Sequence, residues 1–308
     1  MKSVKKDKMK CILIGYGYWG KILENYLKQS DQFELAGIYR SHNQNLPDST
    51  ALLAEGIECA FVCVPLCSHF NVVSSMLDSR VHVFCEKPLC HSLSETQYLF
   101  QKARHADRIL FTDYIYTVSP SLQYIKNNLG ILGGIKYIRM SIRQFGKFYR
   151  NENVYEVLGV HMISVLIYLF DMKQDEIHIP HVESVSGVCN EAEAGIIFFK
   201  IKDIKGIIDC SLLSDKKERK IEFICDNGVM IFDMMEKYSV KIIQHIKPSQ
   251  DEFQKERKEL YRRQFDEKNN LKNILESFCH AVLHRETENE RISLQTAYVL
   301  EQISRYLK

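Results

Sequence analysis

The sequence predicts an α/β protein with an N-terminal doubly wound parallel sheet and a C-terminal α+β domain built on a large open, mostly antiparallel sheet. Three observations support this prediction. Residues 10–112 alternate short apolar strands with helices, which is typical of a doubly wound sheet. A glycine-rich turn follows the first strand. After residue 120 the strands alternate apolar and polar residues, as in sheets with one solvated face. This change of pattern predicts two domains, residues 1–118 and residues 119–308.

The elements of the first domain follow one another closely. Strands are expected at residues 10–14, 33–39, 58–64, 81–85 and 108–112, and helices at 19–29, 70–77 and 92–105. The strand at 58–64 is nearly all apolar, which indicates burial on both faces. Ser92 or Ser94 can cap the last helix, and Glu95 stands three residues after Ser92, as in a capping box.

The second domain is expected to begin with a helix at residues 119–129 and a strand at 135–144. In that strand Ile138, Met140 and Ile142 alternate with polar residues, so one face is buried and the other is solvated. The remaining elements are a helix at 154–170, strands at 182–188, 194–201, 206–212, 220–225 and 229–232, and helices at 270–284 and 293–307. Asn227-Gly228 predicts a hairpin between the last two strands. The densely charged stretch 251–272 is interpreted as a solvated helix or a mobile connection.

The composition is that of an ordinary globular protein, with 45% apolar residues, 26% charged residues and a formal net charge of +2. This near-balance of charge argues against a nucleic-acid-binding surface. No apolar run approaches the roughly 18 residues of a membrane span, so no membrane association is expected. The ten cysteines include no CxxC pair, and we interpret them as buried thiols in a reducing cytoplasm, without a metal site. Translation is compatible with a start at Met1 or at Met9.

The glycine-rich turn lies between a predicted strand and a predicted helix and reads Gly15-Tyr16-Gly17-Tyr18-Trp19-Gly20. In this context Gly15 allows a tight turn, Gly17 lets the backbone approach a pyrophosphate, and Gly20 lets the helix pack close to the strand. Free N–H groups at the start of the helix then face the phosphates. The alternative is that the glycines serve only a tight turn. We expect a dinucleotide site here, which includes Tyr18 and Trp19.

The second strand ends at Arg40 and Ser41, about 20 residues past Gly20, where NAD-binding proteins usually place an acidic residue on the ribose 2′-hydroxyl. A carboxylate there would repel a 2′-phosphate, whereas arginine and serine can bind one. The sequence therefore favours NADP as the cofactor, with NAD as the second choice. The alternative is that Arg40 stacks on the adenine or points to solvent.

The tripeptide Glu86-Lys87-Pro88 directly follows a predicted strand, at the sheet edge where ligands bind in open α/β folds. A proline after a site residue can hold a cis bond and fix the direction of the lysine. Hydride transfer from an alcohol needs a base for the hydroxyl proton, and a partly desolvated lysine can supply it. Alone, such a tripeptide is more often a surface Glu-Lys pair, and a residue such as His161 on an apolar helix is more often structural.

Taken together, these residues resemble the glucose–fructose oxidoreductase, inositol dehydrogenase and rhizopine-catabolism (Gfo/Idh/MocA) family of NAD(P)-dependent oxidoreductases over nearly the whole chain. The glycine turn matches the family's cofactor loop, Val64-Pro65 with His69 resembles its Thr-Pro…His segment, and Cys85-Glu86-Lys87-Pro88 resembles its signature. Residues 113–120, 153–164 and 211–219 are similar to segments of members that act on nucleotide sugars in surface-polysaccharide synthesis.

The residues and the resemblance together give a set of expected site residues. Lys87 and His161 would be catalytic, and the substrate contacts would be Lys87, Tyr114, Arg143 and His161. The cofactor contacts would be Gly15, Gly17, Tyr18, Trp19, Gly20, Arg40, Ser41, Pro65, His69 and Glu86. The resemblance also implies a homodimer or homotetramer formed through the open face of the large sheet.

Three departures from the family pattern surround His161. The family's aspartate four residues before the histidine is Val157, its aspartate directly after the histidine is Met162, and its tryptophan is Glu156. The carboxylate expected to assist Lys87 and His161 is therefore missing. Glu156 lies about 100° around a helix from position 157, so it is not an obvious substitute.

These observations predict an NAD(P)-dependent oxidoreductase that transfers a hydride between nicotinamide and a hydroxyl or keto carbon of a sugar or nucleotide sugar. The resemblance places such a reaction in carbohydrate or surface-polysaccharide biosynthesis. One alternative is a catalytically weakened, cofactor-binding sensor or regulatory protein. The other is an oxidoreductase on a non-sugar substrate, such as an imine or a linear tetrapyrrole.

Overall fold

The computed structural model describes residues 8–40, 47, 49–173, 176–189, 191–246 and 256–307. The chain divides into two compact units: unit 1 comprises Met1–Tyr114 and Leu271–Ala297, and unit 2 comprises Ile115–Asn270 and Tyr298–Lys308. The sequence patterns placed the division at residues 118 and 119 and kept all later residues in the second domain. The difference arises because residues 271–297 pack with the first sheet, and local patterns do not encode such a long-range association.

Unit 1 contains a five-stranded parallel sheet in the order β2-β1-β3-β4-β5. Its strands are β1 (Met9–Ile14), β2 (Phe33–Tyr39), β3 (Cys59–Val62), β4 (His82–Cys85) and β5 (Leu110–Thr112). Its helices are α1 (Tyr18–Gln29), α2 (Ser49–Ala54), α3 (Leu66–Asp78), α4 (Leu93–Ala106), α7 (Asn270–His284) and the first part of α8 (Glu288–Ser304). Because β1 has β2 on one side and β3 on the other, the strand order reverses there, which is where open α/β sheets bind ligands.

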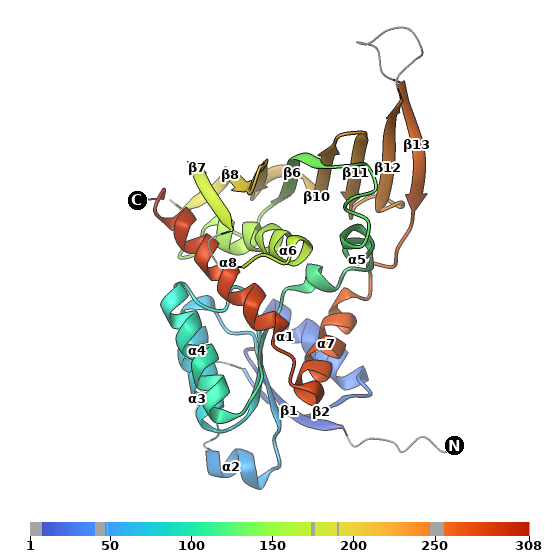
Figure 1. The fold of residues 1–308 in the computed structure, drawn as a ribbon. Helices are drawn as coiled ribbons and strands as arrows, with labels where there is room; N and C mark the ends of the chain where they lie inside the picture. Colours follow the sequence, from blue (N-terminus) through green and yellow to red (C-terminus); the bar gives the residue numbers. More distant parts are fainter. Residues whose placement is uncertain are drawn as a thin grey trace, which may run out of the picture. The chain divides into compact units, whose positions relative to one another are not determined.

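Alternating strand residues build a core on each face of this sheet. On one face Phe61 and Phe84 pack against Phe278 of α7, with ring centroids 5.6 Å apart in both pairs. On the other face Ala60 and Val62 belong to a buried cluster that includes residues of α3 and α4. Figure 1 shows α3 and α4 on one side of the strands and α1 and α7 on the other. The apolar run of β3 follows from this two-sided burial.

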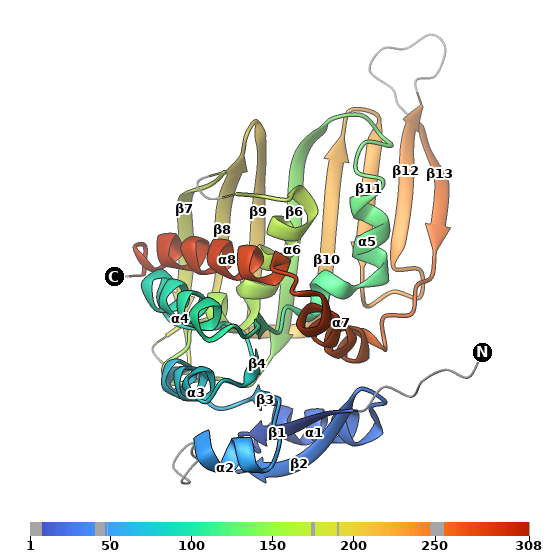
Figure 2. The same cartoon turned by 60° about the horizontal axis from the view of Figure 1, so that its bottom comes forward.

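Unit 2 contains an eight-stranded sheet in the order β13-β12-β11-β10-β6-β9-β8-β7, in which β6 and β9 are parallel and the other neighbours are antiparallel. Its strands are β6 (Ile135–Phe145), β7 (Ile177–Ser186), β8 (Ala192–Ile201), β9 (Ile204–Ser211), β10 (Leu213–Cys225), β11 (Gly228–Asp233), β12 (Val240–Ile246) and β13 (Glu256–Arg263). Its helical segments are η1 (Ile115–Val118), α5 (Pro120–Lys126), the π-helical turn η2 (Tyr155–Gly159), α6 (Val160–Phe170) and the end of α8. Figure 2 shows α5 and α6 against one face of this sheet. The predicted fold class, with a mostly antiparallel second sheet, is confirmed.

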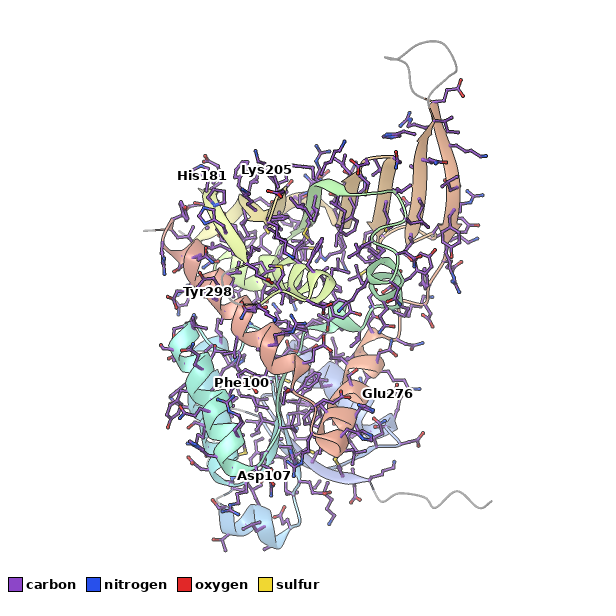
Figure 3. All side chains as sticks on the ribbon, in the orientation of Figure 1. Phe100, Asp107, His181, Lys205, Glu276 and Tyr298 are labelled. Carbon is purple, nitrogen blue, oxygen red and sulfur yellow. The ribbon has the colours of Figure 1, made fainter. Side chains whose placement is uncertain are left out.

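The opposite face of the eight-stranded sheet carries charged side chains. On β6 the side chains of Ile138 and Ile142 are buried, and the residues that alternate with them point to the other face. There the Arg139 guanidinium lies 3.5 Å from the carboxylate of Glu222 on β10. Lys205 of β9, labelled in Figure 3, lies on the same side, away from α6. The sheet therefore has one apolar face, covered by helices, and one polar face.

Several local predictions are confirmed. The Ser92 hydroxyl accepts a hydrogen bond from the backbone N–H of Glu95 at 3.2 Å and caps α4, as the capping box indicated. The Asn227-Gly228 turn joins the antiparallel strands β10 and β11. Within the described residues, no helix combines the length and the apolar character that crossing a membrane requires.

The interpretation of residues 251–272 was wrong. Residues 256–263 form β13, which pairs with β12, a strand that the sequence patterns did not reveal; residues 251–255 lie outside the described part of the chain. All but one residue of β13 are exposed, because it is the edge strand of the sheet and buries neither face. Charged edges of this kind discourage pairing with other chains, and they remove the alternation that identifies a strand.

Candidate active site

The glycine-rich turn joins β1 to α1, as predicted. Gly15 has φ +96°, and a Cβ there would lie 2.4 Å from the carbonyl oxygen of Cys63, in the segment after β3. A Cβ at Gly20 would lie 2.2 Å from the carbonyl oxygen of Gly15. Both positions therefore exclude a side chain, because the segment after β3 lies too close to Gly15 and the end of β1 lies too close to Gly20.

Gly17 is different, because a Cβ there would meet no atom within 4 Å. It is the N-cap of α1, where no side chain caps the helix and the first turn contains no acidic residue. The backbone N–H groups and the positive end of the helix dipole therefore face open space. This combination suits an anionic group of a ligand, and a dinucleotide pyrophosphate fits it.

Arg40 lies beside this turn. Its guanidinium is 4.8 Å from the centre of the Tyr16 ring, and its carbonyl oxygen accepts a hydrogen bond from the Tyr16 N–H at 3.2 Å. The Tyr16 hydroxyl in turn donates a hydrogen bond to the Glu24 carboxylate of α1. An exposed cation is thus held next to the expected pyrophosphate position, while Ser41 lies outside the described residues.

Lys87 follows β4 at the carboxyl end of the sheet, where the backbone N–H of Glu86 donates to the carbonyl oxygen of Val62 at 3.0 Å. Glu86 and Lys87 are half-buried, and the Lys87–Pro88 peptide bond is cis, as expected. The lysine and the glycine-rich turn therefore both lie at the carboxyl edge of the five-stranded sheet.

His69 does not have the environment of a cofactor ligand. Its side chain is buried, with Nδ1 3.0 Å from the carbonyl oxygen of Pro88 and Nε2 2.9 Å from that of Val64. Burial lowers the pKa of His69. The ring joins the segment after β3, which includes Pro65 at the N-cap of α3, to the segment that carries Lys87. Both ring nitrogens of His69 therefore face carbonyl oxygens of the two loops, and its contact with a cofactor stays a prediction.

In unit 2, His161 occupies the first turn of α6, directly after the π-helical turn η2. Its half-buried ring packs against Tyr116 of η1, with ring centroids 4.9 Å apart. The Tyr116 hydroxyl accepts a hydrogen bond from Nε of the buried Arg219 at 3.1 Å. Single π-helical turns occur frequently at functional sites, so the position of η2 agrees with a functional His161.

The structure offers no simple replacement for the missing aspartate in unit 2. Val157 lies buried in η2, and the Glu156 carboxylate accepts hydrogen bonds from Asn153, at 3.0 Å from its backbone N–H and at 2.8 Å from Nδ2. Glu156 therefore closes the turn that precedes α6, in agreement with the view that it does not substitute for the aspartate.

Two expected substrate contacts have other environments. Tyr114 is only 1% exposed, and burial raises the pKa of its hydroxyl, so it belongs to the core of unit 1. Arg143 lies on the polar face of the large sheet, where its guanidinium is 2.8 Å from the Glu218 carboxylate and 3.4 Å from that of Asp209. It is not brought together with His161, which lies on the helix-covered face.

Residues 9–114 match a family model described as an oxidoreductase family with an NAD-binding Rossmann fold. In these residues the chain is similar to the Gfo/Idh/MocA family. The match covers the β1–β5 sheet of unit 1 with its glycine turn and Lys87.

Curated relatives match parts of this chain. The UDP-N-acetylglucosamine 3-dehydrogenase of Acidithiobacillus ferrooxidans is 25% identical over 130 residues, which are 38% of this chain and 41% of the relative. The myo-inositol 2-dehydrogenase of Thermotoga maritima is 20% identical over 166 residues, which are 50% of each. The chain spans at most about half the length of the curated relatives it matches.

Solved structures resemble both units. GenD2 from gentamicin A biosynthesis, in complex with NAD, superposes with a TM-score of 0.80 at 16% identity and covers 99% of this chain and 95% of its own. KijD10, a 3-ketoreductase from Actinomadura kijaniata in complex with TDP-benzene and NADP, superposes with a TM-score of 0.77 at 15% identity and covers 96% of both chains. At these identities the likeness shows the fold alone.

Sequence reasoning missed Tyr116 and Arg219 as neighbours of His161. The sequence does contain an indication for Arg219. It stands two and four residues before Ile221 and Phe223, which are buried on the helix-covered face of β10, so its side chain points to the same face. A charged residue at a buried position of a strand is expected to have a specific partner. Tyr116 carries no comparable signal, since η1 is too short to show a periodic pattern.

The open space at Gly17 gives a direct test of the cofactor cradle. We expect Gly17→Ala to leave the unfolding temperature nearly unchanged, because its Cβ meets no protein atom, and to weaken NADPH binding about tenfold or more, because the Cβ would meet the pyrophosphate. The readout is the emission of Trp19, the single tryptophan of the chain, which lies in the first turn of α1 and is 43% exposed.

Gly130→Ala is the matched control, because a Cβ there also meets no atom within 4 Å and Gly130 lies in unit 2. It should retain the NADPH affinity of the unchanged protein. Equal affinities of the Gly17→Ala and Gly130→Ala proteins would contradict a pyrophosphate site at α1.

Proposed function

We propose that this protein is an NADP-dependent oxidoreductase that transfers a hydride between the cofactor and a hydroxyl or keto carbon of a sugar or nucleotide sugar. The observation that carries the proposal is the uncapped N-terminus of α1 at Gly17, in the same row of strand ends as Lys87. The family of residues 9–114 supports oxidoreductase chemistry. The names of the two relatives, a UDP-N-acetylglucosamine dehydrogenase and an inositol dehydrogenase, support a carbohydrate substrate.

In this proposal, side chains of the protein transfer the proton and position the substrate. When bound, NADP(H) supplies or accepts the hydride. Lys87 takes the hydroxyl proton during oxidation, or returns it to the carbonyl oxygen during reduction. Its charged form also polarises the substrate oxygen. His161, with its ring packed against Tyr116, is proposed as the second group that binds and orients that oxygen.

The choice of NADP over NAD rests on Arg40. Its guanidinium is exposed and stands beside the glycine turn, where no acidic residue occupies the position that usually contacts a ribose 2′-hydroxyl. Arginine can bind a 2′-phosphate through paired, charge-assisted hydrogen bonds.

We expect Arg40→Asp to weaken NADPH binding by about tenfold or more and to change NADH binding much less, because a carboxylate repels the 2′-phosphate alone. Arg40→Lys keeps the charge and is the matched control, with an intermediate loss. Calorimetric titration of each protein with both cofactors measures the effect. An equal loss of affinity for the two cofactors would show that Arg40 does not read the 2′-phosphate.

We expect Lys87→Met to lower kcat by roughly 10²- to 10⁴-fold while NADPH binding persists, because the change removes the proton-transfer group and keeps the cofactor cradle. Lys102→Met is the control, since Lys102 of α4 pairs with Asp78 and takes no part in the proposed site. The assay follows nicotinamide absorbance with a panel of nucleotide sugars and polyols. A Lys87→Met protein as active as the unchanged one would exclude Lys87 from the chemistry.

The buried Val157 favours one second candidate, a protein that binds the cofactor without turnover and acts as a sensor. This candidate requires saturable NADPH binding and no absorbance change with any substrate of the panel. In that case Val157→Asp, which restores the family's residue, should create measurable activity.

The proposal includes a homodimer or homotetramer formed through the polar face of the large sheet. Positive and negative side chains alternate there, as in the pairs of Arg139 with Glu222 and Arg143 with Glu218. A face that carries both signs of charge is compatible with a second copy related by a two-fold axis, in which the same patch of both copies forms the interface.

A further inference from the structure

A buried arginine of unit 2 is surrounded by uncharged hydrogen-bond acceptors. The side chain of Arg219 on β10 is 5% exposed. Its Nη1 donates to the carbonyl oxygens of Arg143 at 2.9 Å and of Glu218 at 2.7 Å, its Nη2 to Oε1 of Gln144 at 2.6 Å, and its Nε to the hydroxyl oxygen of Tyr116 at 3.1 Å. Among the residues that the structure describes, no carboxylate pairs with this guanidinium, since that of Glu218 pairs with the Arg143 side chain. Neutral oxygens satisfy the donors of a buried cation without cancelling its charge.

Of these four acceptor oxygens, only the Tyr116 hydroxyl carries a hydrogen of its own. Its oxygen accepts from Nε of Arg219, so its hydrogen points away from the guanidinium. A hydroxyl whose oxygen accepts from a cation is a stronger donor, because hydrogen bonds in a chain polarise one another. The Tyr116 side chain is half-buried, and within the described part of the chain no group accepts from its hydroxyl. The hydroxyl hydrogen is therefore available to a ligand oxygen.

The ring of Tyr116 also holds this hydroxyl in the neighbourhood of His161. The two ring centroids are 4.9 Å apart and the ring planes are inclined by 58°, a tilted arrangement that aromatic pairs favour. Tyr116 belongs to η1 and His161 to the first turn of α6, and both elements lie in unit 2. The contact thus places a polarised phenol next to the imidazole that is proposed to bind the substrate oxygen.

We propose that Tyr116 is a further catalytic residue, whose hydroxyl donates a hydrogen bond to the reacting oxygen that His161 binds. Arg219 is the positioning residue that holds and polarises this hydroxyl. The proposal rests on the function proposed above and names a further group of the same site. During reduction, negative charge develops on the substrate carbonyl oxygen, and a donor that is fixed beforehand and backed by a buried cation stabilises that charge. The Tyr116 proton stays on the phenol, and proton transfer remains the role of Lys87.

Tyr116→Phe removes the hydroxyl and keeps the ring that packs against His161. We expect it to lower kcat by about 10- to 10³-fold and to leave the NADPH affinity unchanged, because a donor to the developing charge is lost and the cofactor cradle is intact. Tyr261→Phe is the matched control, since the Tyr261 hydroxyl on β13 also accepts from a guanidinium, that of Arg263 at 3.4 Å, but in an exposed pair. Equal kcat values of the Tyr116→Phe and Tyr261→Phe proteins would overturn the proposal.

A double-mutant cycle tests the positioning role of Arg219. Arg219→Lys keeps the charge and loses the forked donors. Because Arg219 acts through the Tyr116 hydroxyl, the variant with both changes should lose no more kcat than the more affected single variant, within about twofold. Losses that multiply would contradict this role. Circular dichroism verifies that each variant is folded, and Tyr116→Phe tests the contact by itself if Arg219→Lys does not fold.

Probe binding measures the contact without turnover. The full chain loaded with NADPH is titrated calorimetrically with UDP-N-acetylglucosamine and with myo-inositol, the compounds named in two relatives. Tyr116→Phe should bind the probe that the unchanged protein binds roughly 3- to 10-fold more weakly, because one hydrogen bond is lost. Equal affinities would overturn the contact.

The outcomes separate this proposal from the function on which it rests. An unchanged protein that neither turns over any sugar nor binds either probe contradicts the proposed function, and the role of Tyr116 falls with it. An active unchanged protein with an inactive Lys87→Met variant and a fully active Tyr116→Phe variant contradicts the role of Tyr116 alone.

Discussion

The close approach of the segments after β1 and β3 to each other, and of α1 to the end of β1, is the constraint on which the site depends. Side chains at Gly15 and Gly20 would lie 2.4 and 2.2 Å from backbone oxygens, so these segments can pack together only with glycine at both positions. That packing directs the uncapped N-terminus of α1 across the carboxyl ends of the strands. Gly17 is then left open to solvent, and no described protein atom requires glycine there, which agrees with the proposed pyrophosphate contact.

A second set of contacts fixes the loop that carries Lys87. The His69 ring lies between the carbonyl oxygens of Val64 and Pro88, and the backbone N–H of Asp113 joins the end of β5 to the carbonyl oxygen of Cys85. The single N–H of the neutral imidazole donates to one of the two oxygens, and a buried carbonyl oxygen left without a donor costs about 1–3 kcal/mol, so this bond favours one loop conformation. The ends of β3, β4 and β5 are thereby joined around Lys87. A group that transfers a proton to a reacting oxygen needs such a fixed position.

The sequence was sufficient for features that neighbouring residues determine. The glycine turn, the Ser92 cap and the alternation of β6 are local, and the family signature added Lys87 to them. Contacts between distant segments could not be predicted. The bridge made by His69, the burial of Tyr114 and the ion pairs of Arg143 depend on which strands and helices become neighbours, and the edge strand β13 lacked a buried face to reveal it.

The central claim is that Lys87 and the start of α1 serve one bound dinucleotide. The structure of the full chain with NADPH bound tests this most directly. We expect pyrophosphate oxygens within hydrogen-bond distance of the first backbone N–H groups of α1, at Gly17, and the nicotinamide ring beside Lys87 at the end of β4. A pyrophosphate bound elsewhere, or a nicotinamide ring out of reach of Lys87, would contradict it.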